Sequence, residues 1–396
     1  MITEFTLTLK LCAPLALHQT RASVQYVETL DYIPGAALRG ALAEAYLAQH
    51  GKLDDTFHAL FLSDQVQYGD LWPIVEGKST TLIPATARVC KRYGFNHSAS
   101  FRDTLLDALS GQYADVKCKC INDKQKECGE SLDRVGGYLC DLETVESLSP
   151  RSRLRVSTAI ERVTGTVARE MLFTQHTLTG KRKSRDKDGP ENKAPLFFQG
   201  TLRLVAPTLQ DNLGILLKTG TRLFLGSGRG RGLGEIEVKA WEQATVADSL
   251  PDRWQKFNDA AQRAGGDPDT RYFSLTLLSH LALRDDLLRP VLGEISPQHF
   301  GLPDSVAWAR YKDSDQPVLF LSAITVPGWN AALGLPKPDT VALARGAVLL
   351  GQCDPGQEQA VLARLAEIEA EGVGERRGEG FGRVAACYPI HYEQWR

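Results

Sequence analysis

Apolar residues occupy every second position from Phe5 to Leu11, and threonine or lysine fills the positions between them. A period of two residues is typical of a β-strand that buries one face. Further along, apolar residues recur at helical spacing over residues 36–49, with Pro34 before this segment and Gly51 after it. Proline at the start and glycine just past the end are common helix boundaries. We therefore expect the chain to begin with a strand and then a helix.

This beginning is repeated in the second half of the chain. Phe-Thr-Leu-Thr-Leu at 5–9 matches Phe-Ser-Leu-Thr-Leu at 273–277, which lies 268 residues later. Each half also ends in a helix-like segment, a glycine-rich loop and a strand-like segment, but these endings lie only 148 residues apart. The first half therefore holds about 120 additional residues, which we expect to form insertions. The pattern predicts an α+β protein made of two similar units, for which the βαββαβ ferredoxin-like arrangement is the simplest form.

The repeats also suggest domain boundaries. We expect a first domain at 1–246, a linker at 247–271 and a second domain at 272–396. One insertion in the first domain, at 88–148, contains five of the eight cysteines. The other, at 175–196, places basic residues between two strand-like runs, which predicts a β-hairpin with a basic tip.

The two glycine-rich loops read Gly-Ser-Gly-Arg-Gly-Arg-Gly-Leu-Gly at 226–234 and Gly-Glu-Arg-Arg-Gly-Glu-Gly-Phe-Gly at 374–382. The backbone amides of such segments can approach a ligand closely while the arginines supply positive charge, a combination that suits a phosphate chain. Neither loop is a dinucleotide fingerprint, because Arg231 and Glu379 occupy the sixth position, where G-x-G-x-x-G requires glycine. A tight turn between helix and strand, without a ligand, is the alternative interpretation.

Composition restricts the class of protein. With 43% hydrophobic residues, a chain of 396 residues can bury sizeable cores. No stretch is long and apolar enough for a membrane span, and the first residues lack the features of a signal peptide, so we expect a cytoplasmic protein. The net charge is −2, which argues against a general coat for nucleic acid and requires any polyanion site to be local.

The clustering of cysteines between Cys90 and Cys140 favours a metal site over a disulfide framework. Zinc takes four soft ligands in a tetrahedron, and the Cys-Gly pair at 128–129 resembles the knuckle of a zinc ribbon. The insertion has few large apolar residues, so a bound metal would help it to fold. We expect Zn2+ to be bound by Cys90, Cys118, Cys120 and Cys128, with Cys140 or His97 as substitutes.

Arginines alternate with other residues from Arg151 to Arg155, so in an extended strand all of them point to one face. Such an arrangement can follow a line of phosphates, and Ser157, Thr158 and Arg162 would continue the same path. A solvated edge strand whose charges prevent aggregation is the alternative interpretation.

Several of these segments resemble one family. The run Ile33-Pro-Gly-Ala-Ala-Leu-Arg-Gly40 resembles a signature of the RAMP superfamily of CRISPR effector subunits, and both glycine loops resemble the glycine-rich loop of that superfamily. The doubled unit, together with the segment 157–173, is similar to the Cas Five-like subunit of type III-D CRISPR complexes. The resemblance implies two tandem ferredoxin-like (RRM-like) domains in a non-catalytic subunit that caps the effector complex at the 5′ handle of the CRISPR RNA. The implied partners are the CRISPR RNA, a neighbouring RAMP backbone subunit and the large polymerase-type subunit, with target RNA contacted indirectly.

The resemblance also implies where the RNA lies. In the superfamily the RNA backbone crosses the first helix and the glycine loop, and an inserted hairpin, here 175–196, separates bases. From this match and the charge pattern together, the expected RNA-binding residues are Gly35, Arg39, Arg151, Arg153, Arg155, Ser157, Thr158, Arg162, Lys181, Arg182, Lys183, Gly226, Ser227, Gly228, Arg229, Gly230, Arg231, Arg376 and Arg377.

Two other functions stay open. A Cas Six-like endoribonuclease that processes CRISPR RNA precursors would use His18, which follows the first strand, but acid–base cleavage needs a second group such as His50 or His58 beside it. Cleaving RAMP subunits carry an aspartate upstream of Pro-Gly, and residues 23–25 are Ser-Val-Gln. We therefore expect no enzymatic activity. The third possibility is an adaptor that contacts only protein.

Overall fold

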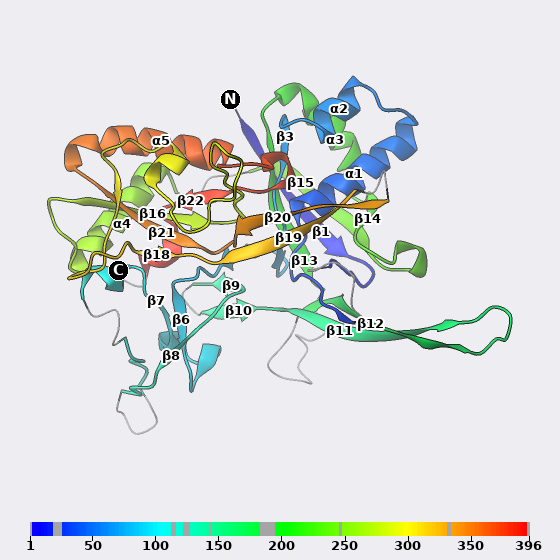
Figure 1. The fold of residues 1–396 in the computed structure, drawn as a ribbon, viewed down its shortest axis with the longest axis horizontal. Helices are drawn as coiled ribbons and strands as arrows, with labels where there is room; N and C mark the ends of the chain where they lie inside the picture. The colour runs from blue at the N-terminus through cyan, green and yellow to red at the C-terminus, as the bar shows by residue number, and fades with distance from the viewer. Residues whose placement is uncertain are drawn as a thin grey trace.

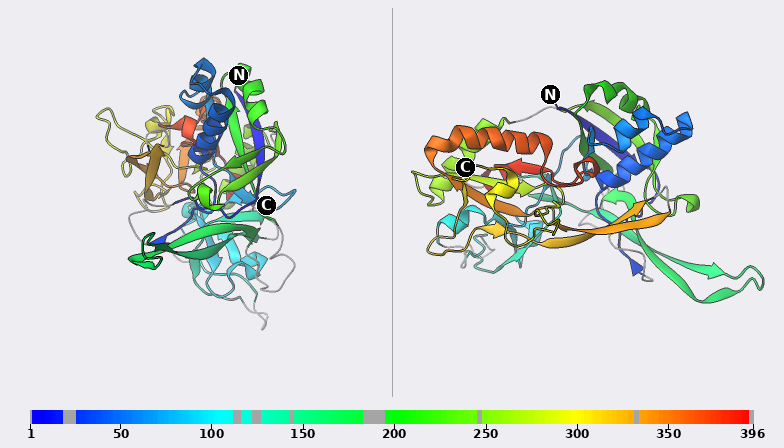
Figure 2. Two further views of the ribbon diagram at one scale, coloured as in Figure 1. Left: turned by 90° about the vertical axis from the view of Figure 1, so that its right-hand side faces the viewer. Right: turned by 45° about the horizontal axis from the view of Figure 1, so that its top comes forward.

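The computed structural model describes residues 2–18, 26–111, 116–121, 127–142, 145–182, 195–244, 248–330 and 334–393. Two α/β units lie side by side, one made mainly by the N-terminal part of the chain and the other by its last third (Figure 1). A group of small sheets lies beneath them, and one long hairpin extends away from the rest of the molecule. The right-hand view of Figure 2 shows the same hairpin projecting from the molecule.

The first unit is a six-stranded antiparallel sheet in the order β14-β15-β1-β13-β3, with β4 also paired to β13. The buried face of β1 packs under three helices, so the predicted alternation from Phe5 to Leu11 is confirmed. The first helix begins at Gly35 and ends before Gly51, whose φ of 69° is left-handed. The elements are β1 (Thr3–Leu11), α1 (Gly35–His50), α2 (Asp55–Phe61), β3 (Val66–Tyr68), β4 (Trp72–Ile74), β13 (Phe197–Leu204), α3 (Gln210–Leu216), β14 (Arg222–Phe224) and β15 (Glu235–Gln243).

The second unit repeats this strand order. Its sheet runs β17-β21-β16-β22, which corresponds to β3-β13-β1-β15 read in the same direction, and β18 also pairs with β21. Between β16 and β17 the described residues form a short 3-10 helix at Pro297–Phe300 in place of a counterpart of α1. The elements are α4 (Leu250–Arg263), β16 (Arg271–Leu277), β17 (Ala307–Trp308), β18 (Leu319–Phe320), β21 (Val348–Cys353), α5 (Glu358–Glu371) and β22 (Val384–Ala386).

The segment expected as a linker, 247–271, contains the helix α4. Ser249 caps this helix by accepting from the backbone N–H of Asp252, and Trp254 and Phe257 are buried in the core of the second unit. These residues therefore belong to the second unit and hold it together.

The cysteine-containing insertion forms two small three-stranded sheets. It packs on the second unit, because Leu105, Leu106 and Leu109 are part of that unit's core. Asp103 also lies 3.0 Å from His391, and both are buried. The strands are β5 (Thr81–Leu82), β9 (Tyr138–Asp141) and β10 (Glu146–Leu148) in one sheet, and β6 (Ala87–Cys90), β7 (Phe101–Asp103) and β8 (Leu132–Arg134) in the other.

Each unit extends a long hairpin, and the two hairpins are equivalent. In the first unit it is formed by β11 (Pro150–Ile160) and β12 (Val167–Arg182), and in the second by β19 (Ala323–Asn330) and β20 (Leu335–Leu343). β12 also pairs with the two-residue strand β2 (Tyr26–Val27). Each hairpin is anchored by two backbone hydrogen bonds, 3.0 and 2.8 Å long, between Leu15 and Leu178 in one case and Leu281 and Leu343 in the other.

The pairing of β11 with β12 differs from the hairpin that the sequence pattern predicted at 175–196. The run expected as a strand before the basic tip is part of β12, a strand of 16 residues that pairs with β11. The chain then returns through a bridge between Lys181 and Pro195 into β13. Most of the expected basic tip, including Lys183, lies outside the described residues.

Buried arginines join the two units. Arg383 of the second unit donates to Glu4 at 3.0 Å and to the carbonyl oxygen of Thr201 at 3.0 Å. Arg345 donates to Asp31 at 2.8 Å and lies 3.7 Å from the ring centre of Tyr32. The units therefore form a polar interface of low solvent exposure. Among the helices described, none combines the length and apolarity that crossing a bilayer requires.

Candidate nucleic-acid interface

The two glycine loops have the same backbone geometry. At the four equivalent positions 226/374, 228/376, 232/380 and 234/382, φ is positive in both loops. Each loop contains a single 3-10 turn, Arg229–Arg231 in the first and Arg377–Glu379 in the second. Arg376 adopts the left-handed conformation that glycine adopts at Gly228. The duplication seen in the sequence is therefore a duplication of structure.

Two of the shared glycines are required by close packing. A Cβ on Gly226 would lie 2.2 Å from the carbonyl oxygen of Ala16, and one on Gly374 would lie 2.3 Å from that of Ala282. Each loop thus lies directly against the chain that follows the first strand of its unit. These glycines have a structural role, whichever ligand the loops bind.

The first loop exposes its outer face. Gly230 and Gly232 are exposed, and a Cβ on either would meet no atom within 4 Å. Arg229 forms a solvent-exposed ion pair with Glu44 of α1. Arg231 is exposed and has no side-chain partner among the described residues. The loop therefore offers open backbone and two accessible guanidinium groups.

The first loop is joined to the long hairpin by three polar side chains. Gln175 of β12 donates to Ser227 Oγ at 2.9 Å, and His18 Nε2 lies 2.9 Å from the same oxygen and 3.2 Å from Gln175 Nε2. Burial lowers the pKa of His18 below its ordinary value, so the ring is neutral at pH 7. The cluster fixes the hairpin against the loop.

One face of the hairpin is basic and points toward this loop. Arg155 is paired in register with Gln175, and Arg153 with Thr177. Residues directly opposite each other on paired strands lie on the same face of a sheet, so both arginines share the face on which Gln175 contacts the loop. Side chains at the base of the hairpin line an open groove of about 840 Å³, namely Pro14, Arg151, Ser152, Arg153, Leu154, Arg155, Val156, Thr177, Thr179 and Lys181.

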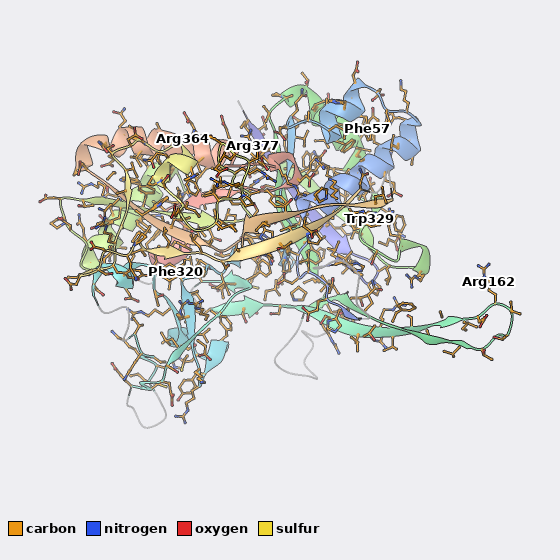
Figure 3. The ribbon with its side chains drawn as sticks, viewed as in Figure 1. Phe57, Arg162, Phe320, Trp329, Arg364 and Arg377 are labelled. Carbon is orange, nitrogen blue, oxygen red and sulfur yellow. The ribbon has the colours of Figure 1, made fainter. Side chains whose placement is uncertain are left out.

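The same face carries an exposed aromatic ring that the sequence analysis did not select. Phe173 is 49% exposed and is paired in register with Ser157. Its signal in the sequence was an apolar residue within a strand, which does not distinguish a core position from an exposed one. Arg162 marks the far tip of the hairpin, well away from both units (Figure 3). Thr158 lies on the opposite face of β11, together with exposed apolar side chains such as Val156.

The start of α1 packs closely on β3. The Gly35 amide donates to Asp70 Oδ1 at 2.9 Å, and a Cβ on Gly35 would lie 1.7 Å from the carbonyl oxygen of Tyr68. Burial raises the pKa of Asp70 to about 6, although the Gly35 hydrogen bond opposes this shift. Gly35 thus has a packing role within the signature segment.

The second loop, unlike the first, is covered by protein. Gly378 and Gly380 are buried, and a Cβ on Gly380 would lie 2.4 Å from the Tyr68 carbonyl oxygen. Arg39 donates to Glu379 at 2.7 Å, and Arg376 donates to the other oxygen of Glu379 and to Thr340 at 2.7 Å. Arg39 and Arg376, which were both expected to bind RNA, are therefore held between the units.

The remaining basic candidates differ in accessibility. Arg377 is half-buried between the two units (Figure 3) and has no side-chain partner among the described residues. Lys181 is exposed at the base of the long hairpin. The backbone of Arg182 ends β12, whereas Lys183 lies outside the described residues.

The cysteines of the insertion come together. The sulfur atoms of Cys90, Cys118 and Cys128 all lie within 4.8 Å of one another. Cys90 Sγ is 3.8 Å from Cys128 Sγ. Two sulfurs bound to a tetrahedral zinc ion at about 2.3 Å would be about 3.8 Å apart, so this pair fits a metal. The three residues could hold a metal ion.

Cys120 is the fourth of the predicted zinc ligands. It is fully buried, and its Sγ lies 3.0 Å from Cys118 Sγ, closer than the edge of a zinc tetrahedron. Cys140 packs in a different cluster, beside Tyr32 and Trp72. His97 accepts at Nδ1 from the Ala99 backbone N–H at 3.2 Å. Of the expected substitutes, Cys140 is therefore placed away from the sulfur cluster.

A family model described as the RAMP superfamily matches residues 8–237. Among solved structures, the chain is similar to a type III-B Cmr-beta complex bound to cognate target RNA and AMPPnP, with 11% identity over 87% of this chain and 86% of that chain and a TM-score of 0.45. It is also similar to the apo state of Cmr-beta, with 13% identity over 60% of this chain and 97% of that chain and a TM-score of 0.31. A Cas6 product complex is 16% identical over 50% of this chain and 79% of that chain, with a TM-score of 0.30. No curated protein matches the chain.

Proposed function

The chain belongs to the RAMP superfamily, and we propose that it is a non-catalytic CRISPR effector subunit that binds the CRISPR RNA through the first glycine loop and the basic face of the β11–β12 hairpin. The finer assignment, a Cas Five-like subunit of a type III-D complex that caps the 5′ handle, rests on the signature at 33–40 and on the doubled unit. The matching strand orders of the two sheets support the assignment of two ferredoxin-like domains.

One observation carries the proposal. Gln175 links the hairpin to Ser227, so Arg153, Arg155 and the open first loop lie along one continuous surface. Arginines that track phosphates bind RNA without reading its sequence, which is what a subunit holding a fixed RNA end requires. The overall charge of −2 is compatible with this function because Arg153, Arg155, Arg229 and Arg231 supply positive charge locally on this surface.

Two observations support a binding role over cleavage. His18 is already hydrogen-bonded within the cluster with Ser227 and Gln175, and no second histidine among the described residues joins it. His50 instead stacks on Tyr46 at the far end of α1. Cleavage by general acid–base catalysis needs two such groups around one phosphate.

The sulfur cluster is proposed to bind zinc. Cys90, Cys118 and Cys128 would supply three thiolate ligands, with Cys120 as the fourth. The ion would hold the strand that ends at Cys90 to the segment around Cys128, whose backbone N–H donates to Cys120. Its role would be structural, because structural zinc sites stabilise small folds of this kind.

The test is RNA retention by the assembled complex. Arg229→Gln with Arg231→Gln should reduce the amount of CRISPR RNA that copurifies at low salt, and its affinity should fall less steeply with salt concentration than that of the unmodified protein, because phosphate contacts are lost. Arg289→Gln with Arg310→Gln, two exposed arginines of the second unit, is the matched control. Equal retention by both variants would refute the proposal. Cleavage of a labelled repeat RNA that is lost in His18→Ala would favour the ribonuclease instead.

A further inference from the structure

The two glycine loops share one backbone geometry but differ in charge at three equivalent positions, and only one of these reverses the sign. Arg231 of the first loop corresponds to Glu379 of the second. The acidic side chain reverses the charge at the place where the first loop presents an exposed cation. What surrounds Glu379 shows the consequence.

Three cations converge on the Glu379 carboxylate. Arg39 of α1 lies at 2.7 Å, Lys337 of β20 at 3.1 Å and Arg376 Nε at 3.1 Å. Only 12% of the Glu379 side chain is exposed, and 21% of each arginine. A phosphate could reach these cations only by displacing the carboxylate.

Protein covers the face of the second loop that is open in the first. Gly230 and Gly232 face open space, whereas their counterparts Gly378 and Gly380 pack against Asp64 and Tyr68. The strand β3 therefore occupies the side from which a ligand would approach. The open and covered loops lie on one chain and have the same backbone conformation.

We propose that the second glycine loop is a clamp between the two units, in which Glu379 takes the place that a phosphate takes on an anion-binding loop. Glu379 joins α1 of the first unit, the β19–β20 hairpin and its own loop through three ion pairs. As a result, only the first loop binds RNA, so the RNA path ends at the boundary between the units. The RNA half of this statement rests on the proposed function, whereas the clamp does not.

The test has an RNA arm on the unmodified protein. Lysines are acylated with an N-hydroxysuccinimide ester, with and without oligouridine, and the modified peptides are quantified by mass spectrometry. Oligouridine should protect Lys181, at the base of the basic hairpin, and leave the acylation of Lys337 unchanged. Protection of Lys337 would overturn the proposal, because it would mean that RNA reaches the second loop.

The stability arm needs no RNA. Glu379→Gln should lower the melting temperature of the full chain more than Glu375→Gln, a change on the same loop where Glu375 pairs with Arg284 at an exposed position. Equal melting temperatures for the two variants would overturn the clamp. If oligouridine protects neither lysine, the proposed RNA function fails, and the comparison of the two variants still decides whether the clamp exists. Glu379→Asp, which keeps the charge, should recover part of the loss and so separates the ion pairs from side-chain volume.

Discussion

Removing the arginines of β11 should change how RNA binding depends on salt. Arg151, Arg153 and Arg155 are exposed, and none has a side-chain partner among the described residues, so their replacement by glutamine should leave the fold intact. Each phosphate contact on a single strand contributes about 0.7 to the slope of log K against log salt, so three contacts contribute about 2. When the salt concentration rises fourfold, the affinity of both proteins for RNA should fall. The factor by which it falls should be roughly twentyfold smaller for the variant than for the unmodified protein.

The assay is fluorescence anisotropy with labelled oligouridine in a series of potassium chloride concentrations. The control replaces Arg263, Arg289 and Arg310 by glutamine, which removes the same charge from exposed positions of the second unit. If long-range charge alone drives binding, both variants will change the slope equally. An unchanged slope in the β11 variant, or an equal change in the control, would refute the assignment of phosphate contacts to this strand.

Three further predictions follow from individual sites. Burial opposes ionisation of Glu379, but Arg39 and Arg376 outweigh it and hold its pKa at about 2, below the ordinary 4.5. The carboxylate should thus contribute roughly 3 kcal/mol of stability above pH 4.5 that is lost as the pH falls toward 2. In chemical denaturation, the difference in free energy of unfolding between the unmodified protein and Glu379→Gln should shrink over that range. A difference that is independent of pH would contradict this prediction. Cys90→Ser should lower the zinc content measured by elemental analysis from about one ion per chain, whereas Cys12→Ser, an exposed cysteine, should not; equal metal content in both variants would exclude the site. Phe173→Ala should weaken oligouridine binding by about 1–3 kcal/mol if a base stacks on the ring, whereas Leu287→Ala, also exposed, should have no effect, and unchanged affinity for both would remove Phe173 from the interface.

The elements that could be predicted from the sequence are those whose pattern of residues lies within one short segment. The alternation from Phe5 to Leu11 and the helix between Pro34 and Gly51 follow from the periodicity of buried positions, and both are present in the structure. The repeated glycine frame identified two loops of one conformation. The apolar spacing of Trp254 and Phe257 could have indicated α4 within the expected linker, but the loop-like ends of that segment concealed it.

Features that depend on contacts between residues far apart in the chain could not be predicted from local sequence patterns. The role of Glu379 is set by Arg39, which is 340 positions away in the chain, and no local pattern connects them. No side chain of β11 is buried, so this strand lacks the alternation of buried apolar and exposed polar positions by which strands are usually recognised. For the cysteines, the composition indicated a metal site, but only the fold separated Cys140 from the other four.

The central claim is that RNA lies along the first glycine loop and the basic face of β11. Photo-crosslinking of the assembled complex, with 4-thiouridine placed in the CRISPR RNA and the linked peptides identified by mass spectrometry, tests this most directly. The account predicts crosslinks within 226–232 and 150–158 and none within 374–382. Crosslinks to the second loop without any to the first would contradict it.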